Sequence, residues 1–254
     1  MGPLLAFLYG IAAYAAAVAT LLYLIGFSGN LLVPRAVDIG TGAPWAEAAL
    51  VDVLLLVLFA LQHSVMARRG FKERWTRVVP AAVERSTFIV ATCLVLALLF
   101  RFWMPIPEPV LWNVGAPAGK ALVWAVFGLG WVLVLVSTFL IDHFELFGLK
   151  QVWQGFRGTR PAAPRFVTPG PYRLVRHPLY LGFLIAFWAA PTMTVAHLVF
   201  AIMTTGYILI AIQLEERDLI VAHPEYAAYR RDVPMILPVA ARRDDGADAT
   251  ATTR

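Results

Sequence analysis

The sequence predicts an all-α membrane protein, a polytopic bundle of five to six transmembrane helices that ends in a helical hairpin. Hydrophobic residues make up 60% of the 254 residues and charged residues only 15%, far from the average composition of soluble domains. Several apolar runs approach or exceed the length that spans a bilayer. The chain has a single cysteine, Cys93, which excludes an internal disulfide.

The apolar runs define the expected helices in order along the chain. A sixth run at 179–190 is too short to span comfortably, so we expect a C-terminal hairpin, and the sequence leaves open whether its first arm fully spans the bilayer. The other five runs are each long enough to cross a bilayer: residues 4–27, 46–66, 86–103, 120–141 and 193–214.

The segments between and after these runs are polar or interrupted. Residues 146–176 contain several Gly and Pro residues, and we expect a loop there, whereas a piece near 224–232 is amphipathic. We predict one integral-membrane domain over residues 1–241, with 170–238 as its cofactor-binding C-terminal part. A polar tail at 242–254 is expected to be disordered.

Basic residues alternate strongly between the polar segments, which predicts the topology. Lys and Arg number one, six and none in the first three connections, then six in residues 146–176 and six in the C-terminal tail. Because cytoplasmic loops carry the excess of basic residues, both termini are predicted to be cytoplasmic and the connectors at 28–45 and 104–119 to lie outside. The net charge of +5 therefore indicates topology and affinity for anionic lipids, and no nucleic-acid partner is expected.

Polar residues flank the C-terminal hairpin on the predicted cytoplasmic side. Pro178 suits the first turn of a helix, so His177 lies at a helix start, where free backbone N–H groups favour an anion. If the chain doubles back near Pro191, the two polar ends of the hairpin meet in one cytoplasmic cofactor pocket. The predicted lining of this pocket is Arg173, Arg176, His177, Tyr180, Glu215 and Glu216.

A pocket of this composition suits a zwitterionic, partly cationic molecule. Arg and His side chains bind a carboxylate, whereas Glu side chains and aromatic faces attract a cation. S-adenosylmethionine has this charge pattern. Interfacial Arg, Tyr and Trp residues are also ordinary membrane anchors, so composition alone does not decide between the two interpretations.

A motif in the same region carries a family resemblance. It consists of Arg176-His177-Pro178-x-Tyr180-x-Gly182, a hydrophobic hairpin, Glu215-Glu216-x-x-Leu219 and Tyr226-x-x-Tyr229. This pattern resembles the C-terminal signature of the isoprenylcysteine carboxyl methyltransferase superfamily, integral-membrane enzymes with S-adenosylmethionine as cofactor. The resemblance implies that the cofactor is bordered by His177, Tyr180, Leu181 and Gly182, held by Glu215 and Glu216, and enclosed by Tyr226, Tyr229 and Arg230.

The whole chain resembles the bacterial members of this superfamily that act on a small thiol. The similarity extends to Gln62-His63-Ser64 and to Asp142-His143-Phe144-Glu145. It implies S-adenosylmethionine-dependent methylation of methanethiol to dimethyl sulfide at the cytoplasmic face of the bacterial inner membrane. Membrane lipids are the expected surroundings, and the sequence identifies no protein partner.

Three other functions stay open at this point. The acceptor could instead be lipidic, either a prenylcysteine-like carboxylate or a phospholipid amine. A nicotinamide-dependent membrane reductase is a second alternative, because sterol-reductase-like folds have a comparable C-terminal hairpin. A non-enzymatic small-molecule transporter is the third, although no inverted repeat supports it.

Methylation of a thiol calls for a proton acceptor, because the pKa of a small thiol is at or above ~8.5 and the neutral form dominates at pH 7. The candidates are His63, Asp142, His143 and Glu145. We prefer a pair in which Asp142 orients a histidine, first His63 and next His143. The same residues could instead tie two helices together. Zinc could also activate a thiol, but no cysteine ligand or metal-ligand spacing supports it, so no metal is expected.

Overall fold

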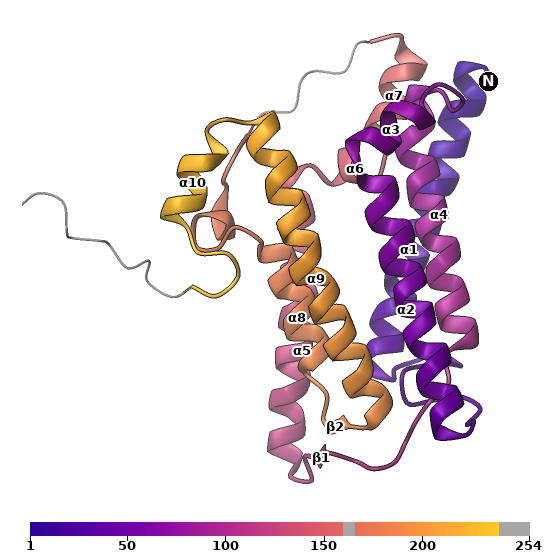
Figure 1. Cartoon of the computed structure of the whole chain (residues 1–254), viewed down its shortest axis with the longest axis vertical. Coiled ribbons are helices and arrows are strands. Elements are labelled where there is room, and N and C mark those ends of the chain that lie inside the picture. Colours follow the sequence, from indigo (N-terminus) through magenta and orange to yellow (C-terminus); the bar gives the residue numbers. More distant parts are fainter. Residues whose placement is uncertain (160–165, 239–254) are drawn as a thin grey trace, which may run out of the picture.

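The computed structural model of the chain describes residues 1–159 and 166–238, and the tail predicted at 242–254 lies outside the described residues. The described part is an all-α bundle with almost no sheet (Figure 1). This architecture confirms the predicted fold class, a polytopic membrane helical bundle. Five of its helices are long and apolar enough to cross a membrane: α1 (Pro3–Gly29), α2 (Trp45–Ala67), α4 (Ala81–Phe102), α5 (Pro117–Ile141) and α9 (Val195–Ala222).

The C-terminal hairpin has one short arm and one long arm. The short arm, α8 (Pro178–Trp188), has 11 residues and is about 16 Å long, half of the ~30 Å hydrocarbon layer. The chain then turns through β2 (Thr192–Met193), which pairs antiparallel with β1 (Trp112–Asn113). The hairpin expected from the sequence is therefore present, and its first arm is shorter than the hydrocarbon layer.

The long arm, α9, continues beyond its apolar run. The sequence predicts that Glu215 and Glu216 close this helix, but it extends to Ala222. Glu, Arg and Leu are good helix formers, and the first proline comes only at Pro224. Both carboxylates therefore project from the side of a helix, where neighbouring elements can contact them.

Short helices occupy the polar segments of the chain. The amphipathic piece near 224–232 is helical, as α10, and the segment expected to be a loop at 146–176 contains a helix, α7. The short helices are α3 (Arg69–Trp75), α6 (His143–Leu146), α7 (Leu149–Arg157) and α10 (Tyr226–Asp232), with a 3₁₀ turn at Gly170–Arg173.

The loop prediction is wrong for α7 because this segment has an apolar stripe. Leu149, Val152, Trp153 and Phe156 follow one another at helical spacing. Val152 is fully buried, and its side chain lies against Gly10 of α1, where an added Cβ would come within 2.3 Å of it. The stripe therefore packs on α1 and holds α7 against the bundle.

A glycine pair permits the close crossing of α5 and α8. A Cβ at Gly130 would lie 2.8 Å from the carbonyl oxygen of Gly182, and a Cβ at Gly182 would lie 2.7 Å from the carbonyl oxygen of Gly130. Small residues let helix backbones approach in this way in membrane proteins. The pair fixes α8, and with it the start of the hairpin, against α5.

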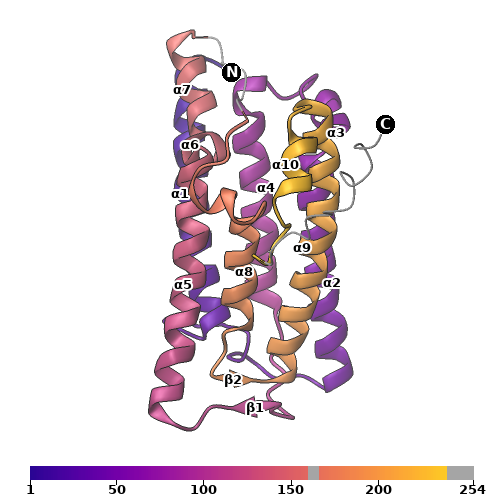
Figure 2. The ribbon, with the colours of Figure 1, turned by 90° about the vertical axis from the view of Figure 1, so that its left-hand side faces the viewer.

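The two ends of the bundle differ in composition. One end, called here the basic end, carries the start of α1 together with α3, α6, α7 and α10 (Figures 1 and 2). The opposite end, called the connector end, carries residues 30–44 and the β1–β2 pair. The helix ends that the sequence predicts to gather on one side are at the basic end.

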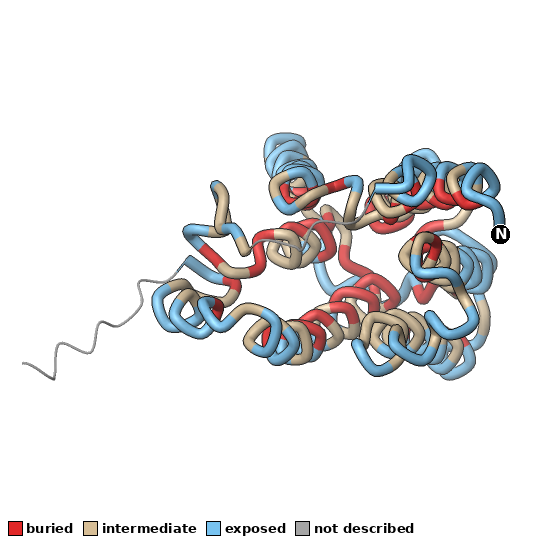
Figure 3. Tube along the Cα trace, turned by 90° about the horizontal axis from the view of Figure 1, so that it is seen from above, coloured by how far each residue is buried: buried red, intermediate tan, exposed pale blue. Residues whose placement is uncertain are grey.

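The core lies between the helices, with exposed residues on the outside (Figure 3). Its largest cluster includes Phe27, Phe100, Trp103, Phe127 and Phe200, all buried. Many leucines on the outer faces of α1, α2 and α5 are exposed. Such a surface matches a lipid environment, which does not penalise apolar side chains outside the core.

Candidate functional site

The carboxylate of Glu216 is the centre of a buried polar cluster at the hairpin. The Nε of Arg176 donates to its Oε1 at 2.7 Å, His177 Nε2 lies 3.0 Å from the same oxygen, and the Tyr226 hydroxyl donates to it at 3.2 Å. Arg230 Nε lies 3.0 Å from Oε2, but this oxygen accepts no hydrogen bond among the described residues. Five of the predicted cofactor residues therefore come together, from α9, α10 and the segment before α8.

Arg176 has a structural task that the sequence did not indicate. Its Nη1 donates to the carbonyl oxygens of Arg230 at 2.9 Å and of Val233, and its backbone N–H donates to Pro234 O at 2.9 Å. These bonds hold the segment after α10 against the start of α8. Arg176 thus fixes the end of the described chain and is largely occupied by protein partners.

Aromatic residues surround this cluster. The Tyr180 hydroxyl donates to Glu215 Oε2 at 2.8 Å. Burial raises the pKa of Tyr229 to about 12, and burial beside Glu216 raises the pKa of Tyr226, so both phenols stay neutral donors at physiological pH. The hydroxyl of Tyr172 is buried with no hydrogen-bond partner among the described residues.

Three other predicted cofactor residues have different surroundings. Gly182 is buried against Gly130 of α5, so its missing side chain permits close helix packing. Leu181 packs on Ile208, Ile212 and Ile236. Arg173 is exposed, in the 3₁₀ turn before α8, and is free to contact a ligand that enters from this end.

Asp142 is paired with a lysine, and the predicted His–Asp pair is not formed. Lys150 Nζ donates to Asp142 Oδ2 at 2.5 Å and to Glu145 Oε2 at 2.8 Å, and Asp142 Oδ1 caps α6 by accepting from the Glu145 N–H. Burial acts to raise the pKa of Asp142, but the bonds from Lys150 and Glu145 hold it below its usual value. The partner, Lys150, lies in the first turn of α7, in the segment that the sequence predicts to be a loop.

His143 is enclosed on every side. Its Nδ1 lies 2.9 Å from Thr138 Oγ1, and the Thr138 hydroxyl donates its proton to Leu135 O at 2.7 Å, so Nδ1 must carry the hydrogen. The remaining nitrogen, Nε2, accepts from the Tyr14 hydroxyl at 3.0 Å. The ring stacks on Phe139, with centroids 4.2 Å apart. Both nitrogens therefore have protein partners.

His63 has the same kind of threonine partner but a free second nitrogen. Its Nδ1 lies 3.2 Å from Thr92 Oγ1, whose hydroxyl donates to Phe88 O at 3.0 Å, so this ring also carries its hydrogen on Nδ1. In the part of the chain that the structure describes, Nε2 makes no hydrogen bond. The ring lies between Phe59 and Phe88, at centroid distances of 5.4 and 4.9 Å. Its unshared electron pair is available to an incoming proton.

An ion pair connects the helix of His63 to the hairpin. Arg68, just after α2, lies 3.1 Å from Asp218 of α9. No sequence signal identifies these partner residues, because none of them forms a local motif with its partner: Arg68, Thr92, Thr138 and Lys150. Within residues 1–159 and 166–238, no group of three His, Cys, Asp or Glu side chains could hold a metal ion.

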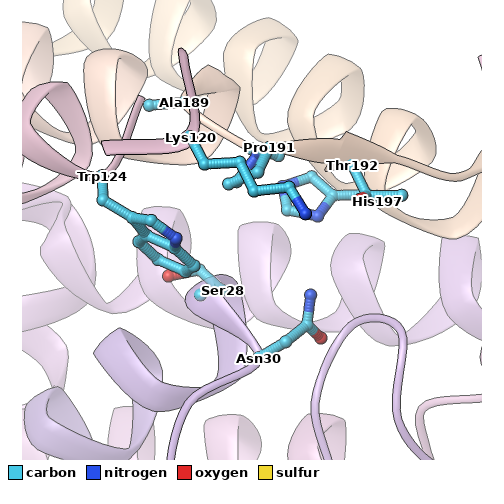
Figure 4. A pocket seen from close by; sticks show the side chains of 10 residues that line it. Ser28, Asn30, Lys120, Trp124, Ala189, Pro191, Thr192 and His197 are labelled. Atoms are coloured by element: carbon cyan, nitrogen blue, oxygen red, sulfur yellow. The ribbon is translucent and has the colours of Figure 1, made fainter. Parts of the chain in front are cut away.

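His197 lies at the connector end, as its position in the sequence predicts. Its Nε2 faces Phe187 O at 3.1 Å and its Nδ1 faces Asp38 Oδ2 at 3.3 Å. Both partners are acceptors, and the Asp38 carboxylate lies within ion-pair distance of the ring. A cavity of about 270 Å³ lies beside this pair, and Figure 4 shows Lys120 reaching across it toward His197 and Asn30. This cavity is at the opposite end from the candidate site.

The chain is similar to several curated proteins over most of its length. A Pseudomonas sp. (strain GM41(2012)) protein named methanethiol S-methyltransferase is 52% identical over 238 residues, 93% of this chain and 91% of that protein. A Mycobacterium tuberculosis protein of the same name is 51% identical over 235 residues, 92% and 96% of the two chains. Nurim of Xenopus laevis is 35% identical over 177 residues, 66% of this chain and 61% of Nurim. No family model and no solved structure matches.

The bundle, the short-armed hairpin and the Glu216 cluster define an integral-membrane protein of the isoprenylcysteine methyltransferase-like class, to which Nurim also belongs. Within this class the first two relatives share half of their residues with the chain. The chain belongs to the methanethiol S-methyltransferase family, and it is a methyltransferase.

Proposed function

We propose that the protein methylates methanethiol to dimethyl sulfide with S-adenosylmethionine, at the cytoplasmic face of the bacterial inner membrane. The observation that carries the proposal is identity of about 50% to proteins named for this activity, over more than nine-tenths of this chain. Basic residues concentrate at the end that holds the candidate site, and the positive-inside rule favours a cytoplasmic position for that end.

The residues at the basic end fit the cofactor that the proposal requires. The Tyr172 hydroxyl is buried and makes no hydrogen bond within the described residues, so it is available to a polar group of a ligand. Glu216 Oε2 has Arg230 Nε at 3.0 Å but accepts no hydrogen bond there, so it can still accept one from an ammonium or hydroxyl group. The exposed Arg173 supplies positive charge for a carboxylate, and the Tyr229 ring supplies an aromatic face. When bound, S-adenosylmethionine supplies a methyl group activated by its sulfonium.

His63 is the proposed proton acceptor. The hydrogen on its Nδ1 is committed to Thr92, so the neutral ring offers the lone pair of Nε2. Phe59 and Phe88 keep water from the two faces of the ring, which favours capture of a proton from the substrate. His143 is less suitable, because its Nε2 already accepts from Tyr14.

The proposal is tested with purified protein in lipid nanodiscs, supplied with methanethiol and S-adenosylmethionine that carries a deuterated methyl group. Headspace mass spectrometry should detect dimethyl sulfide with one labelled methyl. The matched controls are an enzyme-free sample and the His63→Asn protein, in which the amide N–H can still reach Thr92 while the base is missing.

Two results would contradict the proposal. Labelled dimethyl sulfide at the level of the enzyme-free sample would reject the thiol as acceptor. Label recovered in the lipid fraction would assign a lipidic acceptor. Binding of S-adenosylhomocysteine, measured by calorimetry on the same preparation, shows whether the protein is folded in either case.

A further inference from the structure

Arg85 shares an aromatic ring with His63. Its guanidinium carbon lies 5.3 Å from the centroid of the Phe88 ring, and the same ring lies 4.9 Å from the His63 imidazole. The Nε of Arg85 donates to Leu146 O at 2.8 Å, which ties the side chain to the end of α6. The guanidinium is thus held at a fixed place beside the proposed proton acceptor.

The charge of Arg85 is not neutralised by an ion pair. Among the described residues, no carboxylate oxygen lies within 4.0 Å of its guanidinium, and its terminal Nη groups make no hydrogen bond to protein. Glu84, Glu145 and Glu215 act on it only from a distance, and Glu145 is already paired with Lys150. A partly buried guanidinium with free N–H donors is a binding site for an anion.

The position of Arg85 indicates which anion it binds. Arg85 belongs to α4 and His63 to α2, and both lie against the Phe88 ring. The residues suited to the cofactor, including Glu216, Tyr229 and Arg173, belong to the hairpin and the segments beside it. The cofactor side already has its own cations. The anion nearest to both His63 and Arg85 would be the nucleophile itself, because a thiol becomes negatively charged when it loses its proton.

We propose that Arg85 is a catalytic residue that binds the sulfur of the thiolate; this inference rests on the proposed function. The S–H bond breaks and its proton moves to His63 Nε2. The sulfur then forms a bond to the donor methyl carbon, and the electron pair of the broken C–S bond leaves on the neutral thioether. The thiolate lies between two cations, which offsets the repulsion between the imidazolium and the guanidinium and lowers the pKa of the thiol.

The test compares two nucleophiles in the Arg85→Gln and Arg85→Lys proteins. Methaneselenol is ionised at neutral pH, so it needs far less help from a cation than methanethiol. We expect Arg85→Gln to lower kcat/KM for methanethiol about 10- to 100-fold at pH 7 and for methaneselenol less than about threefold. The loss with methanethiol should shrink as pH rises toward the pKa of the free thiol, and Arg85→Lys should restore most of the activity.

The control variant is Arg69→Gln, which removes an exposed arginine that pairs with Glu73 on the surface of α3; it should leave both rates unchanged.

An equal loss for the two nucleophiles would overturn the inference and mark Arg85 as structural. Weaker S-adenosylhomocysteine binding in Arg85→Gln would overturn it too, in favour of a carboxylate of the cofactor. If wild-type protein makes dimethyl sulfide and Arg85→Gln is unaffected, only the inference fails; if wild-type protein makes none, the proposed function fails.

Discussion

Two histidines at the basic end are built on the same local pattern and differ in one contact. In both, a threonine hydroxyl donates to a carbonyl of its own helix and accepts from the ring Nδ1–H: Thr92 for His63 and Thr138 for His143. The second nitrogen of His143 is covered by Tyr14, whereas that of His63 has no partner in the described chain. The same threonine contact therefore places the hydrogen on Nδ1 in both histidines, whether Nε2 is left free or is used in packing.

The comparison shows that the pattern around Nδ1 is not a sign of catalysis. What separates a base from a structural histidine is the accessibility of Nε2. His143 is only 6% exposed and has aromatic neighbours on several sides. His63 is partly buried, and its Nε2 makes no hydrogen bond within the described residues. The changes below test whether a free Nε2 distinguishes a catalytic histidine from a structural one.

The largest effect is expected from the matched changes His63→Asn and His143→Asn. Loss of the base in His63→Asn should lower turnover about 10²- to 10⁴-fold with unchanged binding of S-adenosylhomocysteine, as measured by headspace assay and calorimetry. His143→Asn should keep turnover within about threefold per folded protein. Similar turnover losses in both variants would remove the distinction between them.

The second effect concerns stability. His143→Asn removes a stacked ring and leaves the Tyr14 hydroxyl without its acceptor, at a cost of about 2–3 kcal/mol. The melting temperature in detergent should fall by about 5–10 °C, against a smaller change for His63→Asn. An unchanged melting temperature would show that the His143 contacts contribute little to folding.

The third effect comes from the two threonines. Thr92→Val removes the acceptor of the His63 Nδ1–H, so the ring is no longer held in the tautomer that offers Nε2, and turnover should fall about tenfold. Thr138→Val should cost about 1–2 kcal/mol of stability and leave turnover nearly unchanged. A rate loss in Thr138→Val but not in Thr92→Val would exchange the roles of the two histidines.

The smallest effect is a pH dependence. Burial lowers the pKa of His143, so its neutral form stabilises the fold above the unfolded-state pKa of ~6.5. This contribution is lost as pH falls through the lowered value. The difference in melting temperature between wild type and His143→Asn should therefore narrow from pH 7.5 to pH 5; a gap that widens on acidification would contradict the assignment.

Most of the fold follows from the lengths of the apolar runs. They predict five spanning helices and a short arm, because hydrophobic length must match the bilayer. They do not predict α7, whose signal is the spacing of Val152 and its neighbours amid polar residues, or the extension of α9 past Glu216. The helix α7 depends on its apolar stripe, whereas α9 continues because the residues after its apolar run are good helix formers.

The candidate site could be predicted only in part. Helix ends predict that His63, Asp142, His177 and Glu216 share one end of the bundle, but they do not predict their partners. A helix that is apolar all round carries no signal for the face it turns inward, so neither the Thr92 contact nor the nearness of Arg85 is visible in the sequence. From the sequence alone, Arg85 is one of the six basic residues that indicate topology in the second connection.

The short length of α8 affects how a polar reactant and an apolar reactant can reach the same site. Because α8 starts part of the way along α5 and α9 (Figure 2), the polar segment before it must descend to reach His177. Charged groups are thereby brought below the basic end of the bundle, beside the long apolar helices α5 and α9. Under the proposed function, a polar methyl donor can enter this site from water and an apolar thiol can enter it from the lipid.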